Sequence, residues 1–254
     1  MKKVLIFVLA GLSLAATVFA NLGDVVGTIA IPGGSQAGMG ITDNYLYVTN
    51  YTQGRIYMLN PTSGSVMGSF AAAGGTNTRG LAGVGTGYLW QNQGYSSPYP
   101  TYQTNATTGS VYASFNMPAV YCHGIDPLCT GDGGAGTSYL IVSCYSSYRI
   151  YFMTTAGSIA SSMTITPQMY DIAYDWRNEL IWGGMNSAVC SAVNTTGSTV
   201  ASFSAPVGNI YGMAYYGQYL YVGGTSGNIY RIHCPSGFTG VQPASLGRVK
   251  ALYR

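Results

Sequence analysis

The chain contains 254 residues, of which only 7% are Asp, Glu, Lys or Arg, against roughly 25% in an ordinary soluble domain. Its 47% hydrophobic content is too high for a solvated disordered chain, and its formal net charge of +3 provides no basic stripe for nucleic acid. Gly (36 residues) and Tyr (23 residues) are abundant, whereas the residue types typical of helical proteins are sparse. The composition therefore excludes a disordered chain, a nucleic-acid binder and a helical protein, and it indicates no class of enzyme.

The first twenty residues have the features of a secretory signal peptide. Met1-Lys2-Lys3 forms the positive end, residues 4–14 are mostly apolar, and Ala20 is a small residue directly before the polar Asn21. The apolar run is short for a membrane span and no charged stop-transfer cluster follows it, which favours cleavage over the alternative of an uncleaved anchor. We therefore expect a secreted, extracellular or cell-surface protein that begins at Asn21 and has no transmembrane segment after cleavage.

One sequence pattern then recurs along the chain, a turn ending in Gly followed by Ser-Val-x-x-Ser-Phe. Full copies occupy residues 64–70 and 109–115, and weaker copies occupy residues 23–29, 157–163 and 197–203. The first glycines of successive copies are 41, 45, 48 and 40 residues apart. A period of this length is typical of repeat architectures such as β-propellers.

A second pattern keeps the same period and consists of Gly or Asp followed by an apolar residue. It occurs as Gly40-Ile41, Gly80-Leu81, Gly124-Ile125, Asp171-Ile172 and Gly212-Met213. Two runs rich in Tyr, Val, Ile and Trp follow each copy. The first runs are residues 45–49, 88–91, 139–143, 180–182 and 219–222; the second are residues 55–59, 101–104, 149–153, 188–193 and 228–232. Each unit therefore predicts four short strands, the content of one propeller blade.

Five copies of each predicted strand indicate five blades. The fifth unit lacks a closing strand after Ile232, whereas an additional copy lies at residues 24–29. We expect an all-β fold: a five-bladed β-propeller of four-stranded antiparallel blades over residues 21–234, closed by the N-terminal strand. A β-sandwich is the alternative, and the regular period argues against it. The sequence leaves open whether the N-terminal strand closes its own ring or that of a neighbour.

Residues 235–254 form a C-terminal tail, of which residues 241–254 match no blade. This tail contains three basic residues, Arg248, Lys250 and Arg254. It either packs on its own propeller, contacts a neighbouring subunit or remains free.

The first blade resembles the YVTN family of β-propeller repeats. The resemblance rests on Leu46-Tyr47-Val48-Thr49-Asn50, Gly54-Arg55-Ile56-Tyr57 and Asn60-Pro61-Thr62-Ser63-Gly64, and the later blades match more loosely. It covers most of residues 24–233 and implies a propeller of the NHL/YVTN-like type. Similar repeats occur in prokaryotic exported and surface-layer proteins, so the resemblance implies a fold and no particular activity.

The residues before the second pattern form the candidate functional site, because the innermost strand of each blade lines the propeller axis. They are Met39, Arg79, His123, Tyr170 and Tyr211, joined by Asp171 in place of a glycine and by the nearby Asp126. In one interpretation, Arg79 binds a carboxylate and the tyrosines stack on a sugar. In the other, the group is a structural plug in which Arg79 pairs with Asp171. Catalysis is the least favoured interpretation, because a glycosidase needs carboxylates that converge on one face.

Metal and cofactor sites are not predicted. The two histidines, His123 and His233, fall in different units, and no metal-binding spacing is present.

The five cysteines are an odd number for an oxidising compartment. Cys122 begins an inner strand and Cys144 ends the next antiparallel strand, which predicts a disulfide between them. The sequence does not pair Cys129, Cys190 or Cys234.

Glycosylation signals lie at predicted turns. Asn105 and Asn194 begin Asn-x-Thr sequons, which makes them candidate glycosylation sites.

The leading functional hypothesis is a structural one: an exported, self-associating subunit of a cell-surface layer or extracellular filament. It rests on the low charge, the abundance of Tyr and the extra terminal segment. The alternatives are a propeller that binds a glycan or peptide at the channel mouth, and a lyase or hydrolase that uses His123, Tyr170 and Asp171.

Overall fold

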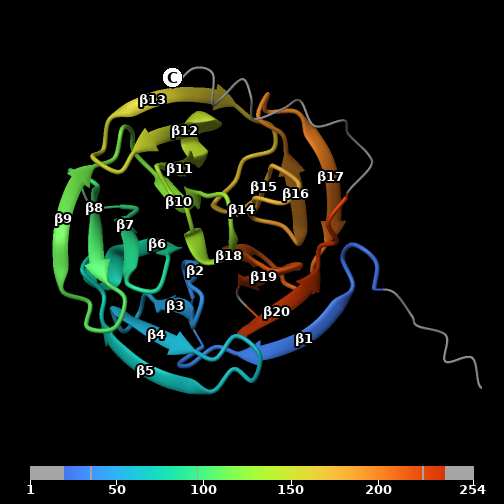
Figure 1. Ribbon diagram of the computed structural model, residues 1–254, viewed down its shortest axis with the longest axis horizontal. Coiled ribbons are helices and arrows are strands. Elements are labelled where there is room, and N and C mark those ends of the chain that lie inside the picture. Colours follow the sequence, from blue (N-terminus) through green and yellow to red (C-terminus); the bar gives the residue numbers. More distant parts are fainter. Residues whose placement is uncertain (1–19, 35, 96, 225, 238–254) are drawn as a thin grey trace, which may run out of the picture.

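Five four-stranded antiparallel sheets surround a central axis in the computed structural model, which describes residues 20–34, 36–95, 97–224 and 226–237 (Figure 1). The predicted five-bladed β-propeller is therefore confirmed. Within the described residues, the only helical segments are three short 3-10 turns: η1 (Gly75–Asn77), η2 (Asp132–Gly134) and η3 (Tyr145–Ser147).

The blades are numbered in chain order, and each runs from its inner to its outer strand. Blade 1 contains β2 (Met39–Ile41), β3 (Leu46–Asn50), β4 (Arg55–Leu59) and β5 (Val66–Ala71). Blade 2 contains β6 (Thr78–Val84), β7 (Tyr88–Gln93), β8 (Pro100–Asn105) and β9 (Val111–Asn116). Blade 3 contains β10 (Cys122–Leu128), β11 (Tyr139–Cys144), β12 (Arg149–Thr154) and β13 (Ile159–Thr164). Blade 4 contains β14 (Asp171–Asp175), β15 (Leu180–Gly184), β16 (Val189–Val193) and β17 (Thr199–Ser204). Blade 5 contains β18 (Ile210–Tyr216), β19 (Tyr219–Gly224), β20 (Asn228–His233) and β1 (Val25–Ala30).

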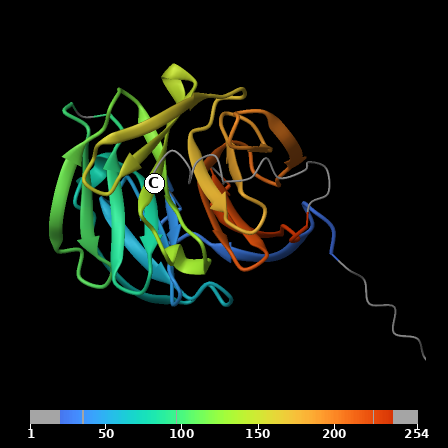
Figure 2. The same cartoon turned by 45° about the horizontal axis from the view of Figure 1, so that its top comes forward.

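The N-terminal strand closes the ring of its own chain. β1 pairs antiparallel with β20, from Val25 opposite Ile232 to Ala30 opposite Asn228 (Figure 2). Two further backbone hydrogen bonds, Gly23 N to His233 O (3.1 Å) and His233 N to Asp24 O (2.8 Å), extend this pairing. The closure leaves no open seam between the first and last blades, as an all-β ring requires.

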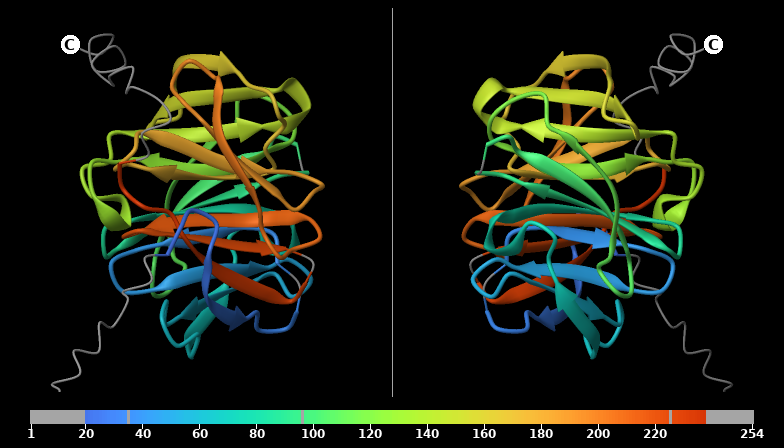
Figure 3. Two further views of the ribbon diagram at one scale, coloured as in Figure 1. Left: turned by 90° about the vertical axis from the view of Figure 1, so that its right-hand side faces the viewer. Right: turned by 90° about the vertical axis from the view of Figure 1, so that its left-hand side faces the viewer.

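The strands run across the thickness of the ring, so each has one end on each of two faces (Figure 3). We call the face at which the inner strands begin the mouth face. It also carries the loops between the second and third strands. The opposite face, which carries the turns between inner and second strands and between third and outer strands, is called the turn face.

The recurring glycine of the first pattern is required by its backbone conformation. Gly23, Gly64, Gly109, Gly157 and Gly197 all have positive φ, between 73° and 90°. A side chain at such a position is strained. In three of these turns, the side-chain oxygen of an asparagine accepts hydrogen bonds from backbone N–H groups. The asparagine lies four residues before the glycine at Asn60 and Asn105, and three residues before it at Asn194. This turn chemistry accounts for the recurring Asn and Thr, and glycosylation of Asn105 and Asn194 stays a prediction.

The glycines of the second pattern have a different role, because they allow the inner strands to converge. A Cβ atom on Gly80 would lie 2.0 Å from the carbonyl oxygen of His123 in the next inner strand. A Cβ atom on Gly124 would lie 2.9 Å from Cα of Asp171, and one on Gly40 would lie 3.0 Å from N of Gly83. The ring therefore closes by contact between backbones at the axis.

Apolar side chains fill the spaces between the blades and between their strands. Trp90 and Trp182 are the largest fully buried side chains, and each packs against a phenylalanine of the outer strand, Phe115 or Phe203, with ring centroids 5.4 Å apart. The Phe of the first pattern thus contributes to the core. Among the described residues, no helix is long and apolar enough to cross a membrane.

Substitution of Gly80 by Ala tests the convergence of the inner strands. We expect Gly80→Ala to lower the free energy of unfolding by about 1–3 kcal/mol, because the new methyl group overlaps the backbone of blade 3. Gly87→Ala is the control, since a Cβ atom there meets nothing within 4 Å, and it should change stability by less than about 0.5 kcal/mol. Urea unfolding measures both values, and equal stability of the two variants would contradict the prediction.

Candidate binding site at the channel mouth

Aromatic side chains from all five blades meet on the mouth face. We call this set the tyrosine cluster: Tyr51, Tyr95, Tyr121, Tyr145, Tyr170 and Tyr211. Tyr95 and Tyr121 are exposed, with 45% and 39% of their surface accessible, whereas Tyr170 is buried. The cluster therefore runs from the solvent to the propeller axis.

His123 lies at the centre of the tyrosine cluster. Its ring makes edge contacts with Tyr170, Tyr95 and Tyr145, with centroid separations of 4.3, 4.7 and 4.9 Å. Tyr170 in turn stacks on Tyr145 at 5.6 Å and meets Tyr211 edge-on at 5.2 Å. Offset and edge-to-face contacts of this kind hold aromatic rings in fixed orientations.

Arg79 is held between two tyrosine rings. Its guanidinium carbon lies 4.6 Å from the centroid of Tyr51 and 4.7 Å from that of Tyr95. The ion pair with Asp171 expected for a structural plug is absent: the one salt bridge within the described part of the chain joins Arg177 to Asp132 on the turn face. Arg79 is thus oriented by cation–π contacts and has no bound carboxylate among the described residues.

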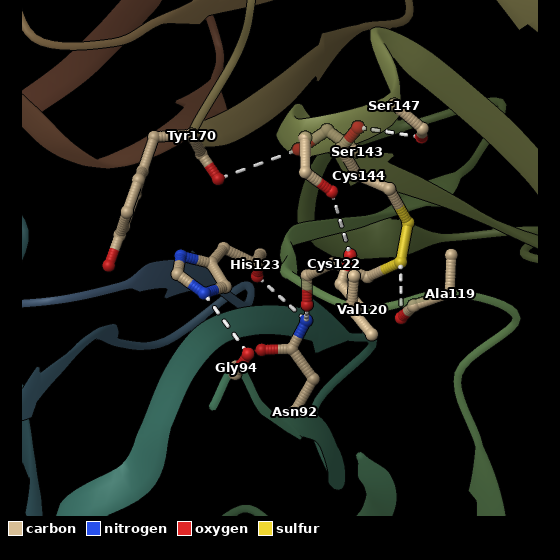
Figure 4. The surroundings of a disulfide bond; sticks show 11 residues. Asn92, Gly94, Ala119, Val120, Cys122, His123, Ser143, Cys144, Ser147 and Tyr170 are labelled. Carbon is tan, nitrogen blue, oxygen red and sulfur yellow. Dashed lines mark hydrogen bonds between the residues drawn. A yellow bond between two sulfur atoms is a disulfide. The ribbon is translucent and has the colours of Figure 1, made fainter. Parts of the chain in front are cut away.

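His123 carries no charge at neutral pH. Burial, and next the positive charge of Arg79, lower its pKa to about 3, although the Gly94 carbonyl opposes this shift. Nε2 lies 3.3 Å from that carbonyl oxygen, so the proton resides on Nε2 and Nδ1 is an acceptor (Figure 4). Nδ1 is buried and has no hydrogen-bond partner in the structure.

The two aspartates near the axis serve the fold. Asp171 accepts a hydrogen bond from the backbone N of Met213 (2.9 Å), and Asp126 accepts one from that of Tyr174 (2.6 Å). Each bond joins an inner strand to the inner strand of the next blade. Burial raises the pKa of both carboxyl groups well above the ordinary value, so neither is a ready anion for acid–base chemistry.

The hydroxyls of Tyr145 and Tyr170 stay protonated at the mouth. Burial raises the pKa of Tyr145 to about 12, and it also raises the pKa of Tyr170. The hydroxyls of Tyr95 and Tyr170 lie 3.5 Å apart. The mouth therefore combines one cation, several phenol donors and flat aromatic faces, which suits recognition of a polar ligand.

The backbone around His123 is anchored from two sides. Cys122 and Cys144 form a disulfide between β10 and β11, which confirms the predicted pairing (Figure 4). The amide of Asn92 donates to the carbonyl oxygens of His123 (2.7 Å) and Cys122 (2.9 Å). The other three cysteines, Cys129, Cys190 and Cys234, are buried free thiols.

The sequence located part of this site. Arg79, His123, Tyr170 and Tyr211 do gather at the mouth, whereas Met39 is fully buried in the core and Asp171 is directed to the neighbouring strand. The sequence patterns did not indicate the other four tyrosines of the cluster, Tyr51, Tyr95, Tyr121 and Tyr145. A signal existed for three of them, because Tyr51, Tyr95 and Tyr145 each follow the second strand of a blade at spacings of 44 and 50 residues. Tyr121 has no counterpart in the other blades.

Metal ligands do not cluster in the described part of the chain: no group of three or more His, Cys, Asp or Glu side chains is present there.

The comparisons with known proteins support the fold. No family model and no curated protein sequence matches the chain, so the likeness to YVTN repeats remains a resemblance. The chain is similar in structure to the glutaminyl cyclase of Myxococcus xanthus, with a TM-score of 0.66 and 12% sequence identity, over 83% of this chain and 95% of that one. At this identity the similarity shows a shared propeller architecture and carries no function.

The protonation state of His123 generates a pH prediction. Its folded pKa of about 3 lies below the ordinary histidine value of 6.5, so the unfolded chain binds a proton that the folded chain excludes. Lowering the pH from about 6.5 towards 3 should therefore destabilise the native protein relative to His123→Gln, whose amide does not titrate. Comparison with this variant removes the opposite effect of Asp126 and Asp171, whose raised pKa values favour the folded state as the pH falls.

Urea unfolding at pH 7.5 and pH 4.5 measures this difference. NMR of the folded protein should in addition show His123 neutral, with its proton on Nε2, down to about pH 4. Titration of His123 near 6.5 in the folded protein would contradict the assignment.

Proposed function

We propose that this protein is an extracellular binding module that holds an acidic oligosaccharide at the mouth face. The observation that carries the proposal is the position of Arg79, a cation clamped between Tyr51 and Tyr95 and without an ion-pair partner among the described residues. A guanidinium oriented in this way is suited to bidentate bonding of a uronate carboxylate. The disulfide is compatible with an oxidising, extracellular compartment.

The tyrosines supply the remainder of the recognition. Exposed aromatic faces at Tyr95 and Tyr121 offer surfaces on which the apolar side of a sugar ring packs, and the phenol groups bond its hydroxyls. Tyr and Arg contribute large contact areas for little loss of side-chain entropy, which makes them effective binding residues.

Binding is favoured over catalysis because the mouth lacks a suitable acid–base pair among its described residues. With a pKa of about 3, His123 is a weak base, and both axial carboxyls already accept backbone hydrogen bonds. The similarity to a glutaminyl cyclase nevertheless makes cyclisation of an N-terminal glutamine a reaction to assay. Turnover of any substrate that disappears in His123→Ala would contradict a pure binding function.

Removal of the Arg79 guanidinium tests the binding proposal. We expect Arg79→Ala to weaken the binding of an oligogalacturonate by at least about tenfold, or about 1.4 kcal/mol, and Arg79→Lys to restore only part of it. Tyr211→Ala should also weaken binding, through loss of an aromatic contact with Tyr170. Isothermal titration calorimetry measures the affinities, and circular dichroism confirms that each variant is folded.

Arg177→Ala is the matched control for this experiment. Arg177 is exposed on the turn face, where it pairs with Asp132, so its loss should leave affinity at the mouth face unchanged. Binding of the matched neutral oligosaccharide with equal affinity would remove the role of the carboxylate. If the protein binds peptides and no acidic oligosaccharide, the result would favour a peptide-binding function.

A structural role is the second candidate, and the outer strands favour it. Each of β1, β5, β9, β13 and β17 has a neighbour on one side only, and these five strands contain no charged residue and no proline. Natural proteins commonly protect such edges with charges or proline. The edges here carry a β-bulge in their first half, as between Val25 and Gly27 of β1, and the second half of each strand pairs without a register shift.

This candidate predicts ordered assembly of the secreted protein. We expect concentration-dependent assemblies in negative-stain microscopy and sedimentation velocity, because uncharged edges permit β-augmentation between copies. Ser114→Lys/Ser202→Lys places charges in the middle of two exposed edges and should reduce assembly, whereas Ser114→Thr/Ser202→Thr should not. A protein that stays monomeric at high concentration would contradict the structural role.

A further inference from the structure

We infer that copies of this protein associate end to end, with the mouth face of one copy on the turn face of the next. The inference rests on the second proposed function, self-association, and it adds to the contacts between outer strands a second pair of surfaces with a defined relative orientation. The described charges carry it, because the topology places opposite signs on the two faces.

The mouth face is positive. Arg55 and Arg149 are the first residues of β4 and β12, both of which start on this face, and Arg79 lies in the tyrosine cluster. Arg55 and Arg149 are exposed and hydrogen-bond serines of the neighbouring outer strands, Ser69 (2.8 Å) and Ser162 (2.9 Å). No acidic side chain among the described residues lies at this face except Asp171, which is fully buried and has a raised pKa.

The turn face is negative. The acidic side chains in its turns are Asp24, Asp43, Asp132 and Glu179, while Asp175 is fully buried. The arginines near this face are Arg177, which pairs with Asp132, and Arg231, which lies over Tyr219. Asp24 and Asp43 are exposed. Although partial burial opposes ionisation of Asp132, hydrogen bonds from Trp176, Gly217 and Arg177 lower its pKa, so this carboxylate is charged at neutral pH.

Exposed apolar side chains are likewise concentrated at the two faces. On the turn face they include the first residues of the outer strands: Val66, Met67, Val111, Tyr112 and Ile159, each more than half exposed. On the mouth face they are mainly the tyrosines Tyr95, Tyr121 and Tyr148. The turn face also has a groove lined by Tyr88, Asn105, Tyr112 and Thr137, which offers a seat for an aromatic side chain.

These features together identify the partner as a second copy. The opposite charges of the two faces orient two copies as they associate, and tyrosine and apolar side chains supply contact area on both surfaces. Because the two surfaces differ, the contact is head-to-tail, and repetition of such a contact builds an open stack of rings in place of a closed dimer.

Charge reversal on one face at a time tests the inference. Arg55→Glu/Arg149→Glu makes the mouth face negative, and Asp24→Lys/Asp43→Lys reduces or reverses the charge of the turn face. Each double variant alone should associate at least about tenfold more weakly than the wild type in sedimentation velocity at low salt, because like charges then oppose each other. Arg79 is left unchanged, so the ligand site is not altered.

The variant carrying all four substitutions is the matched control. It has the same formal net charge as the wild type, with the signs at these four positions exchanged, and it should recover association. A mixture of the two double variants should recover association as well, which keeps the test decisive if the fourfold variant does not fold. Recovery by both routes would support the head-to-tail contact, and a fourfold variant that stays dissociated, although its net charge equals that of the wild type, would contradict it.

Three outcomes would overturn the inference. Double variants that associate like the wild type would exclude these faces, while leaving self-association itself intact. Loss of association on neutralising Arg248, Lys250 and Arg254, with no effect of the double variants, would identify the C-terminal tail as the contact. A wild-type protein that remains monomeric would overturn both this inference and the structural role, and the ligand proposal would stand unaffected.

Discussion

The close approach of the five inner strands at the axis is the constraint on which the rest of this structure depends. At Gly80 and Gly124, the neighbouring inner strand leaves no room for a Cβ atom without displacing its backbone. Where blade 4 carries Asp171 in this position, the side chain bonds the backbone N of Met213 in the next inner strand. Convergence of these strands brings the residues that flank them to a single place, and the mouth cluster is a direct consequence.

The mouth cluster also shows how a protein with few charges organises the ones it has. Arg79 is oriented by tyrosine faces, His123 is kept neutral by burial, and Asp171 accepts a backbone N–H bond through one of its oxygens. Most of the remaining charged side chains of the described residues lie at strand ends and turns, and Asp126 and Arg231 lie within strands β10 and β20. This placement separates the signs between the two faces, and it connects the composition of the chain to its proposed ligand and to its proposed self-association.

The fold was predictable because each repeated pattern has a local cause. The glycine at positive φ, the asparagine that caps a turn, and the alternating apolar residues act within a few positions of one another, so the sequence records them at a fixed period. The disulfide was predictable for a similar reason, since Cys122 and Cys144 flank an antiparallel pair. The strand limits were less accurate: Tyr45 and Ala188 lie in turns, and β7 extends to Gln93.

By itself, the sequence determined five blades, their strand order and four of the residues at the mouth, because periodicity and turn chemistry are local. The tertiary structure alone decided what those residues contact. Arg79 lies against Tyr51 and Tyr95, which come from loops of two different blades, and not against Asp171. It also decided that β1 pairs with β20 of the same chain. Both outcomes depend on distances between segments far apart in sequence, which the inter-blade packing fixes and which no local pattern encodes.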